Sequence, residues 1–166
     1  DKKKEGFFES LRQSKYIFNL SDQAILTSLM SRIEDAMSTT DKLFKEWVTR
    51  CLEYHKEQSK NKTIKKQRIN FHDAPQWAHI QDTIHAFLSQ LDGVMAMLQE
   101  CEAVTENYNK NQLQELHYAM LRIKENQSNL SHVIETIFFD SDRYVVWSES
   151  DANCSNPSFK ISAAPI

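Results

Sequence analysis

Glycine is almost absent from this chain, and its scarcity constrains the fold more than any other feature. Gly6 and Gly93 are the two glycines in 166 residues, where an average chain has about 7%. Proline is also scarce, at three residues. Because tight turns depend on these two residue types, we expect few turns and long helices. Isolated glycines also argue against the glycine-rich loops that bind nucleotide phosphates, so nucleotide hydrolysis by this chain alone is not expected.

Apolar residues recur at steps of three and four along most of the chain, which is typical of amphipathic helices. A brief helix is expected around Phe7–Leu11. The second long helix has a strict heptad pattern, the signature of a coiled-coil seam, and a third follows with a seam of similar length. Three long helices are expected over residues 21–58, 73–101 and 109–140, with Ser21, Asp73 and Asn109 as their N-caps.

The hydrophobic period changes to two beyond Asp142, which predicts strands. The segments Arg143–Trp147 and Ser158–Ser162 flank a polar turn and form a predicted β-hairpin. The fold class is therefore mainly α: long antiparallel helices, as in a bundle or coiled-coil-like arm, with a small C-terminal β-hairpin. An isolated hairpin is marginally stable in water, so we expect it to join a larger sheet and the chain to be part of a larger protein. Residues 1–140 are the expected helical domain and 141–166 the hairpin segment.

The sequence contains no recognisable catalytic motif, and no catalytic residue is assigned. The six histidines are scattered and are expected at ordinary helix-surface positions rather than in a metal site. Cys51, Cys101 and Cys154 are too far apart for a paired-cysteine metal motif, and three thiols cannot all pair within one chain. We expect reduced thiols and no metal or cofactor bound by this chain.

No apolar run approaches the roughly 18 residues of a membrane span, and no secretory leader is visible. These features predict a cytoplasmic protein without a membrane partner. Five acceptor sequons for N-glycosylation, such as Asn19-Leu-Ser and Asn61-Lys-Thr, would carry glycans in a secreted protein. They keep a secreted helical-bundle ligand open as an alternative, which predicts a disulfide between two of the three cysteines.

A basic segment interrupts the helical pattern between Gln58 and Asn70 and is expected to be a loop or a short exposed strand. It has five cations in nine residues, in a chain whose net charge is −3. Such a patch suits phosphate binding, and nearby aromatic rings can stack on bases. Trp77 follows the heptad register and is expected in the core rather than on a stacking surface, and the cations alone equally fit a solvated loop. The candidate DNA-binding residues are Lys60, Lys62, Lys65, Lys66, Arg68 and Phe71.

The order of elements and the C-terminal motifs resemble a known family. A long helix, a basic break and two further helices precede Tyr144-Val-Val-Trp147-Ser-Glu149, and the chain continues through a variable turn to Phe159-Lys-Ile-Ser-Ala-Ala-Pro165-Ile. This arrangement resembles the helical Arch insertion of DinG-type DNA helicases, which are relatives of XPD. The resemblance covers the whole chain as an order of elements, and residues 144–166 carry its sequence specificity.

The resemblance implies that residues from about Phe7 to Asp140 form a non-catalytic Arch and that the hairpin lies at the edge of a motor-domain sheet. It implies that the parent protein is an ATP-dependent DNA helicase, and some similar members carry an exonuclease domain. ATP and Mg²⁺ would then bind to motor domains outside this chain. The iron–sulfur cysteines of some members belong to a different insertion, and Cys51, Cys101 and Cys154 do not match them. The implied partners are single-stranded DNA and the motor domains, with the chain itself monomeric.

A coiled-coil scaffold is the other alternative. Its seams would associate between chains, whereas the Arch interpretation predicts a monomer whose seams are covered from within. The alternatives therefore differ in oligomeric state.

Overall fold

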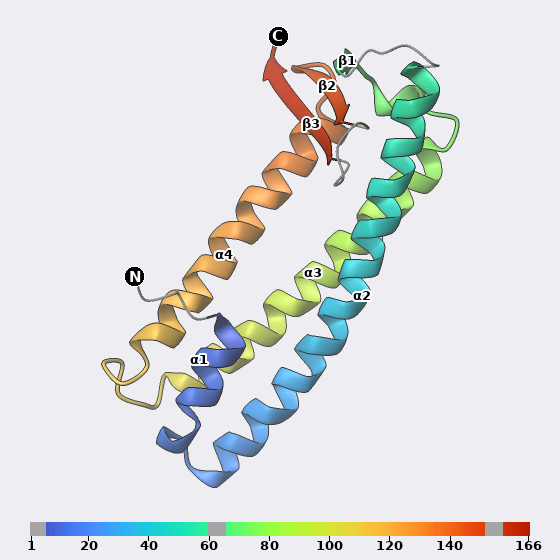
Figure 1. Cartoon of the computed structure of the whole chain (residues 1–166). Helices are drawn as coiled ribbons and strands as arrows, with labels where there is room; N and C mark the ends of the chain where they lie inside the picture. The colour runs from blue at the N-terminus through green and yellow to red at the C-terminus, as the bar shows by residue number, and fades with distance from the viewer. Residues whose placement is uncertain (1–5, 60–65, 152–157) are drawn as a thin grey trace. The chain divides into compact units, whose positions relative to one another are not determined.

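A computed structural model describes residues 6–59, 66–151 and 158–166, and it is mainly helical with a small sheet near the C-terminus (Figure 1). The predicted fold class is confirmed. In chain order, the elements are α1 (Phe7–Gln13), a 3₁₀ turn η1 (Lys15–Ile17), α2 (Leu20–Ser59), β1 (Lys66–Arg68), a 3₁₀ turn η2 (Phe71–Asp73), α3 (Trp77–Thr105), α4 (Gln114–Ile134), a π-helical turn η3 (Glu135–Phe139), β2 (Tyr144–Asp151) and β3 (Ser158–Pro165).

The three long helices are close to where the sequence predicts them, but the three predicted N-caps are wrong. Asn19 caps α2, because its Oδ1 accepts the N–H of Asp22 at 2.8 Å, so Ser21 lies inside the helix. Asp73 ends the turn η2, whose own cap is Asn70, and α3 begins at Trp77. At α2 an asparagine two residues upstream of Ser21 satisfies a free backbone donor. Asn109 lies in the turn before α4, which begins at Gln114, so it is not the N-cap of that helix either.

The contacts divide the chain into two compact units, and each long helix contributes to both. The first unit comprises Asp1–Asp41 and Leu88–Ser128. Its core is built by α1 with the first half of α2, the second half of α3 and the first half of α4. The buried residues at its centre are Leu11, Leu26, Leu29, Ile33, Val94, Leu98, Cys101, Leu116 and Met120. These residues recur at helical spacing, so the hydrophobic pattern of the sequence is the pattern of this core.

The second unit comprises Lys42–Phe87 and Asn129–Ile166 and contains the sheet. Aromatic rings dominate its interior: Trp47 contacts Phe87 and Phe138, and Phe71 contacts Phe138. Aromatic pairs in such tilted and edge-to-face arrangements add to the hydrophobic burial. The boundary expected after residue 140 separates the helical domain from a hairpin that would belong to a motor domain. This boundary stays a prediction.

The sheet has three strands in the order β1-β2-β3, all antiparallel (Figure 1). The predicted hairpin is present as β2 and β3, and both strands are longer than expected. The third strand comes from the basic segment: β1 pairs with β2, with Gln67 opposite Ser148. The basic segment thus includes a short strand at one edge of the sheet, next to the motifs that carry the family resemblance.

Candidate nucleic-acid interface

The structure separates the six predicted DNA-binding residues. Lys60, Lys62 and Lys65 lie outside the described residues. Lys66 and Arg68 are on β1 with exposed side chains. Phe71 is only 1% exposed and packs against Tyr54 and Phe138. Its ring offers no free face to a base, so its assignment as a stacking residue is corrected: it is a core residue.

The strand register places further residues on the same side of the sheet as the two cations. Lys66 lies opposite Glu149, which lies opposite Lys160. Arg68 lies opposite Trp147, which lies opposite Ser162. Directly paired residues project from the same face of a sheet. We call these six residues, Lys66, Arg68, Trp147, Glu149, Lys160 and Ser162, the basic sheet face.

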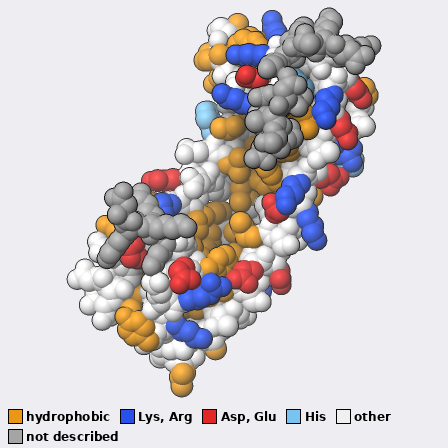
Figure 2. Space-filling view, viewed as in Figure 1, with side chains coloured by type: hydrophobic (Ala, Val, Ile, Leu, Met, Phe, Trp, Pro, Cys, Tyr) orange, Lys and Arg blue, Asp and Glu red, His pale blue; other side chains and the backbone are white. Residues whose placement is uncertain are grey.

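The basic sheet face combines positive charge with an aromatic ring. It has three cations and one carboxylate, and the Nζ of Lys66 lies 5.7 Å from the centre of the Trp147 ring. Figure 2 shows Lys and Arg side chains, in blue, at the end of the second unit that carries the sheet. Proteins that bind single-stranded nucleic acids commonly combine cations, which contact the phosphates, with an accessible aromatic ring, which stacks on a base.

Trp147 and Lys160 are not among the binding residues that the sequence predicts. Both lie about 80 residues or more from the basic segment in sequence, and only the pairing of β1 with β2 brings them together. Alternation within Tyr144–Glu149 predicts a strand, but it gives no register against a three-residue partner.

On the opposite side of β1, Gln67 faces a buried polar cluster centred on His55. The imidazole Nδ1 is 2.6 Å from the Ser148 Oγ, and the Nε2 is 3.0 Å from the Ser150 Oγ. The Gln67 Nε2 donates to the His55 carbonyl at 2.8 Å and lies 3.2 Å from the His55 Nδ1. This cluster ties α2, β1 and β2 together and fixes the strand that carries Lys66 and Arg68.

His55 is 1% exposed, so its expected helix-surface position is wrong. The Gln67 amide nitrogen can only donate, so its position 3.2 Å from Nδ1 favours the neutral tautomer with an acceptor at Nδ1 and the proton on Nε2. Burial lowers the pKa of His55, and the nearby charge of Lys56 lowers it further. The ring is therefore kept neutral and acts as a structural link rather than as a cation for phosphate.

Trp77 is half-buried, in partial agreement with its expected core position. Its ring stacks on His72, with centroids 4.1 Å apart and planes at 28°, and also contacts Phe139. One face of the indole is thus already covered by another side chain. The ring contributes to packing within the second unit and is not part of the basic sheet face.

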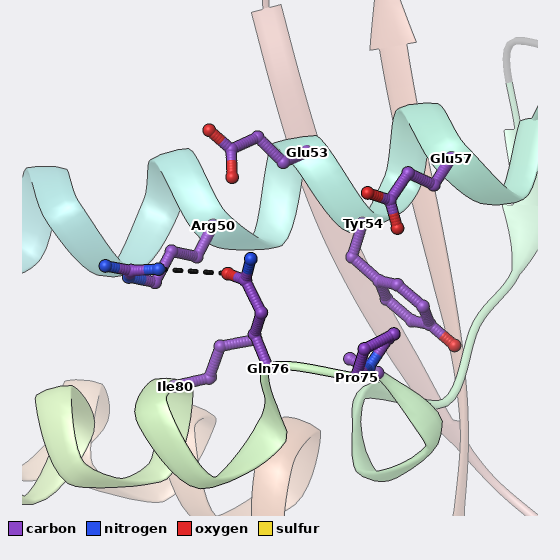
Figure 3. Close-up of a pocket in the computed structure, with 8 residues that line it drawn as sticks. Arg50, Glu53, Tyr54, Glu57, Pro75, Gln76 and Ile80 are labelled. Atoms are coloured by element: carbon purple, nitrogen blue, oxygen red, sulfur yellow. Dashed lines mark hydrogen bonds between the residues drawn. The ribbon is translucent and has the colours of Figure 1, made fainter.

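A small pocket lies between α2 and the start of α3 (Figure 3). Its volume is about 40 Å³, enough for about one water molecule and far too small for a nucleotide. The Arg50 Nη1 donates to the Gln76 Oε1 across it at 2.9 Å, while Glu53 and Glu57 extend from α2 and Tyr54 lies over Pro75. The guanidinium is already engaged within the protein, so the pocket gives no substrate site.

The described residues contain no group of three or more metal-ligating side chains. Cys51 and Cys101 are free and buried. Burial raises the pKa of the Cys51 thiol to about 12 and that of Cys101 to about 11, so both are protonated at neutral pH and are poor nucleophiles. Cys154 lies outside the described residues.

Within residues 6–59, 66–151 and 158–166, no helix combines the length and apolar character needed to cross a lipid bilayer.

Comparison of the chain with protein-family models, curated proteins and solved structures gave no match.

Proposed function

We propose that this chain is the non-catalytic, Arch-like helical module of a cytoplasmic, DinG-type ATP-dependent DNA helicase, and that its basic sheet face contacts single-stranded DNA. The observation that carries the proposal is the pairing of β1 with β2. This pairing places Lys66 and Arg68 on the same face of the sheet as Trp147, which belongs to the segment that resembles the family. ATP and Mg²⁺ would bind to motor domains outside the chain, and an exonuclease domain in the same parent protein would be compatible with this role.

The charge distribution supports weak, sequence-independent binding. The chain has a net charge of −3, so positive potential is confined to local patches such as the basic sheet face. Phosphate contacts of this kind position a strand without reading its sequence, and they weaken steeply as salt rises. A surface that guides DNA beside a motor must bind weakly and without sequence preference, because the strand slides past it.

The internal packing of α3 also favours a module over a scaffold. The seam residues Ile80, Ile84, Phe87, Val94 and Leu98 are each at most 4% exposed. They are covered within their own units and need no helix from another chain.

DNA binding can be tested with the 166-residue chain and a fluorescein-labelled oligothymidine of about 20 nucleotides. We expect weak binding by fluorescence anisotropy at low salt. The double variant Lys66→Gln/Arg68→Gln should reduce the slope of log affinity against log salt by about 1.4, the value for two lost phosphate contacts on a single strand. Equal binding by the variant and the wild type would contradict the proposed interface.

A matched control is the double variant Lys15→Gln/Lys110→Gln, which removes the same charge from exposed positions of the first unit. It should leave the salt slope close to that of the wild type. A similar loss in both variants would mean that net charge, not the basic sheet face, determines the affinity.

The helicase assignment has a separate test in the gene. We expect phosphate-binding (Walker A) and DEAH motifs upstream of these codons, and a Ser/Thr-Ala-Thr-Leu motif shortly downstream. A signal peptide upstream with a stop codon directly after Ile166 would contradict the assignment and favour the secreted helical ligand.

A further inference from the structure

The outer edge of β3 has no partner strand among the residues that the structure describes. β3 spans Ser158–Pro165 and pairs along its whole length with β2 on its other side. The backbone groups that point away from β2 are therefore free to pair with another strand. Figure 1 shows β3, in red, at the opposite edge of the sheet from β1.

Two hydrogen bonds identify these free backbone groups. Ile166 N–H donates to the Arg143 carbonyl at 2.8 Å, so residue 166 faces β2. Because the direction of bonding alternates along a strand, residues 158, 160, 162 and 164 also face β2. The N–H and C=O groups of Phe159, Ile161 and Ala163 then face away from it. On the other side of β2, the Ile69 N–H donates to the Val146 carbonyl at 2.9 Å. Val146 therefore faces β1, and its neighbours Val145 and Trp147 face Ala164 and Ser162 of β3, as this alternation requires.

Pro165 is the next residue in the outward-facing series, and it has no N–H. The free ladder therefore ends there, and it offers three consecutive donor–acceptor pairs two residues apart. An extended backbone matches this spacing, whereas a helix or a small molecule does not.

An apolar cavity adjoins the same strand on its inner side. It has a volume of about 340 Å³ and is lined by α2, the end of α4, η3 and β3, within the range of roughly 300–1,000 Å³ of ligand pockets. Phe44 and Trp47 from α2, Val133 and Ile137 from α4 and η3, and Phe159 and Ile161 from β3 are among its lining residues. Phe44 and Val133 are 40% and 48% exposed, so the cavity reaches the surface.

The two features share Phe159 and Ile161. Their side chains line the cavity, and their backbone groups form the free ladder. A strand added to this edge would point alternate side chains toward the cavity side of the sheet. Its remaining side chains would lie on the outer side, where Lys160 is exposed and an opposite charge is favoured.

We propose that the outer edge of β3 binds an extended polypeptide segment from a partner, with apolar residues at alternate positions facing the cavity and an acidic residue opposite Lys160. The hydrogen-bonding ladder selects the strand conformation, the cavity selects the apolar positions, and Lys160 selects the acidic one. The ladder and the cavity lie apart from Lys66 and Arg68, and Lys160 is the residue that this site shares with the basic sheet face.

The probe is a blocked peptide of about four alternating Glu-Val repeats, a length typical of a strand. Binding is followed by amide hydrogen exchange and chemical-shift changes of the 166-residue chain. We expect exchange at Phe159, Ile161 and Ala163 to slow by roughly tenfold or more at saturation, because these amides become hydrogen-bonded. Amides that already face β2, such as that of Ser162, should change little.

Two control peptides test the specificity. One has the same composition with all Glu residues before all Val residues, and the other is N-methylated at alternate residues so that it cannot complete the ladder. Neither should protect the three amides. Equal protection by the permuted peptide, or no protection by the alternating peptide at about millimolar concentration, would overturn the proposal.

The variant Ala163→Pro removes one outward-facing N–H and leaves the bonds to β2 in place, a position where edge strands accept proline. It should weaken peptide binding by about tenfold. If this variant fails to fold, the N-methylated peptide gives the same test without altering the protein. Protection of the three amides that rises with protein concentration in the absence of peptide would overturn the proposal in favour of pairing between two copies of this chain.

Discussion

At the scale of single residues, His55 shows how burial and hydrogen bonding fix a protonation state. The neutral ring has an acceptor at Nδ1 facing the amide of Gln67, and a proton at Nε2 facing Ser150. Protonation would add a proton at Nδ1 directly opposite the Gln67 N–H groups. The folded chain therefore disfavours the charged ring, in agreement with the lowered pKa of His55.

This arrangement predicts a pH-dependent stability. Below the unfolded pKa of about 6.5, the unfolded chain binds a proton at His55 that the folded chain does not bind. The free energy of unfolding should therefore fall as pH decreases below about 6.5, and it should be fully restored above that value. Urea unfolding followed by circular dichroism at several pH values measures this dependence.

The variants His55→Asn and His132→Asn separate this effect from that of the other histidines. His132 is exposed on α4, so its replacement should preserve the pH dependence. Replacement of His55 should lower stability at neutral pH and reduce the slope. A wild-type slope in His55→Asn would show that another group is responsible.

Sequence alone could not identify His55 or Phe71 in their actual roles. Both flank the basic segment, and their burial depends on β2 and η3, which are more than 65 residues away in sequence. A histidine near the end of a polar helix has no local signal of burial, and an aromatic residue beside cations looks the same whether its ring is stacked in a core or free.

At the scale of elements, β1 is the feature that builds the candidate site. It is three residues long, and short strands depend on side-chain contacts for their position. Lys66 and Arg68 project outward, and Gln67 alone anchors the strand on the inner side through its two contacts with His55.

We therefore expect Gln67→Ala to destabilise the second unit by about 1–3 kcal/mol, because the His55 carbonyl and Nδ1 lose a buried donor. Urea unfolding measures the loss, and faster exchange of the Ile69 amide, which bonds to Val146, reports release of the strand. The neighbouring variant Arg68→Ala is the control and should stay within about 0.5 kcal/mol of wild type. Equal effects of the two substitutions would mean that Gln67 does not anchor the strand.

The helices and the hairpin were predictable because they produce periodic patterns over many residues. The element boundaries were less predictable. Asn19 rather than Ser21 caps α2, and turn residues separate Asp73 from α3 and Asn109 from α4. β1 shows no alternation of apolar and polar residues, because it consists of Lys, Gln and Arg, which are not typical strand formers. Its pairing with β2 is also non-local. The position of Trp147 and Lys160 beside Lys66 and Arg68 depends on the register between β1 and β2, so it could not be predicted from local sequence.

At the scale of the whole molecule, each of the two units has its own apolar core, and the seam residues of the long helices are used in these cores. Among the described residues, most of the apolar seam of α3 is therefore covered within the chain, while Phe44 on α2 and Val133 on α4 stay 40% and 48% exposed. Sequence patterns predicted the seams correctly but could not tell whether they are covered within one chain or between chains.

We expect a monomer of 19.4 kDa by sedimentation velocity, with a sedimentation coefficient that is constant across a roughly hundredfold range of concentration. Internal coverage of the seams is the physical reason. A dimer that forms with rising concentration would favour the coiled-coil scaffold instead. Repeating the experiment with Ala163→Pro distinguishes association through the β3 edge from association through the helices.

The two buried thiols have a practical consequence. Cys101 lies in the core of the first unit and Cys51 in that of the second, so the chain contains one natural alkylation reporter for each unit. In a Cys154→Ser background, the rate at which each thiol reacts with iodoacetamide measures how often its surroundings open. Equal rates under mild denaturant would reveal one cooperative opening, and unequal rates would rank the two units by their local stability without any introduced label.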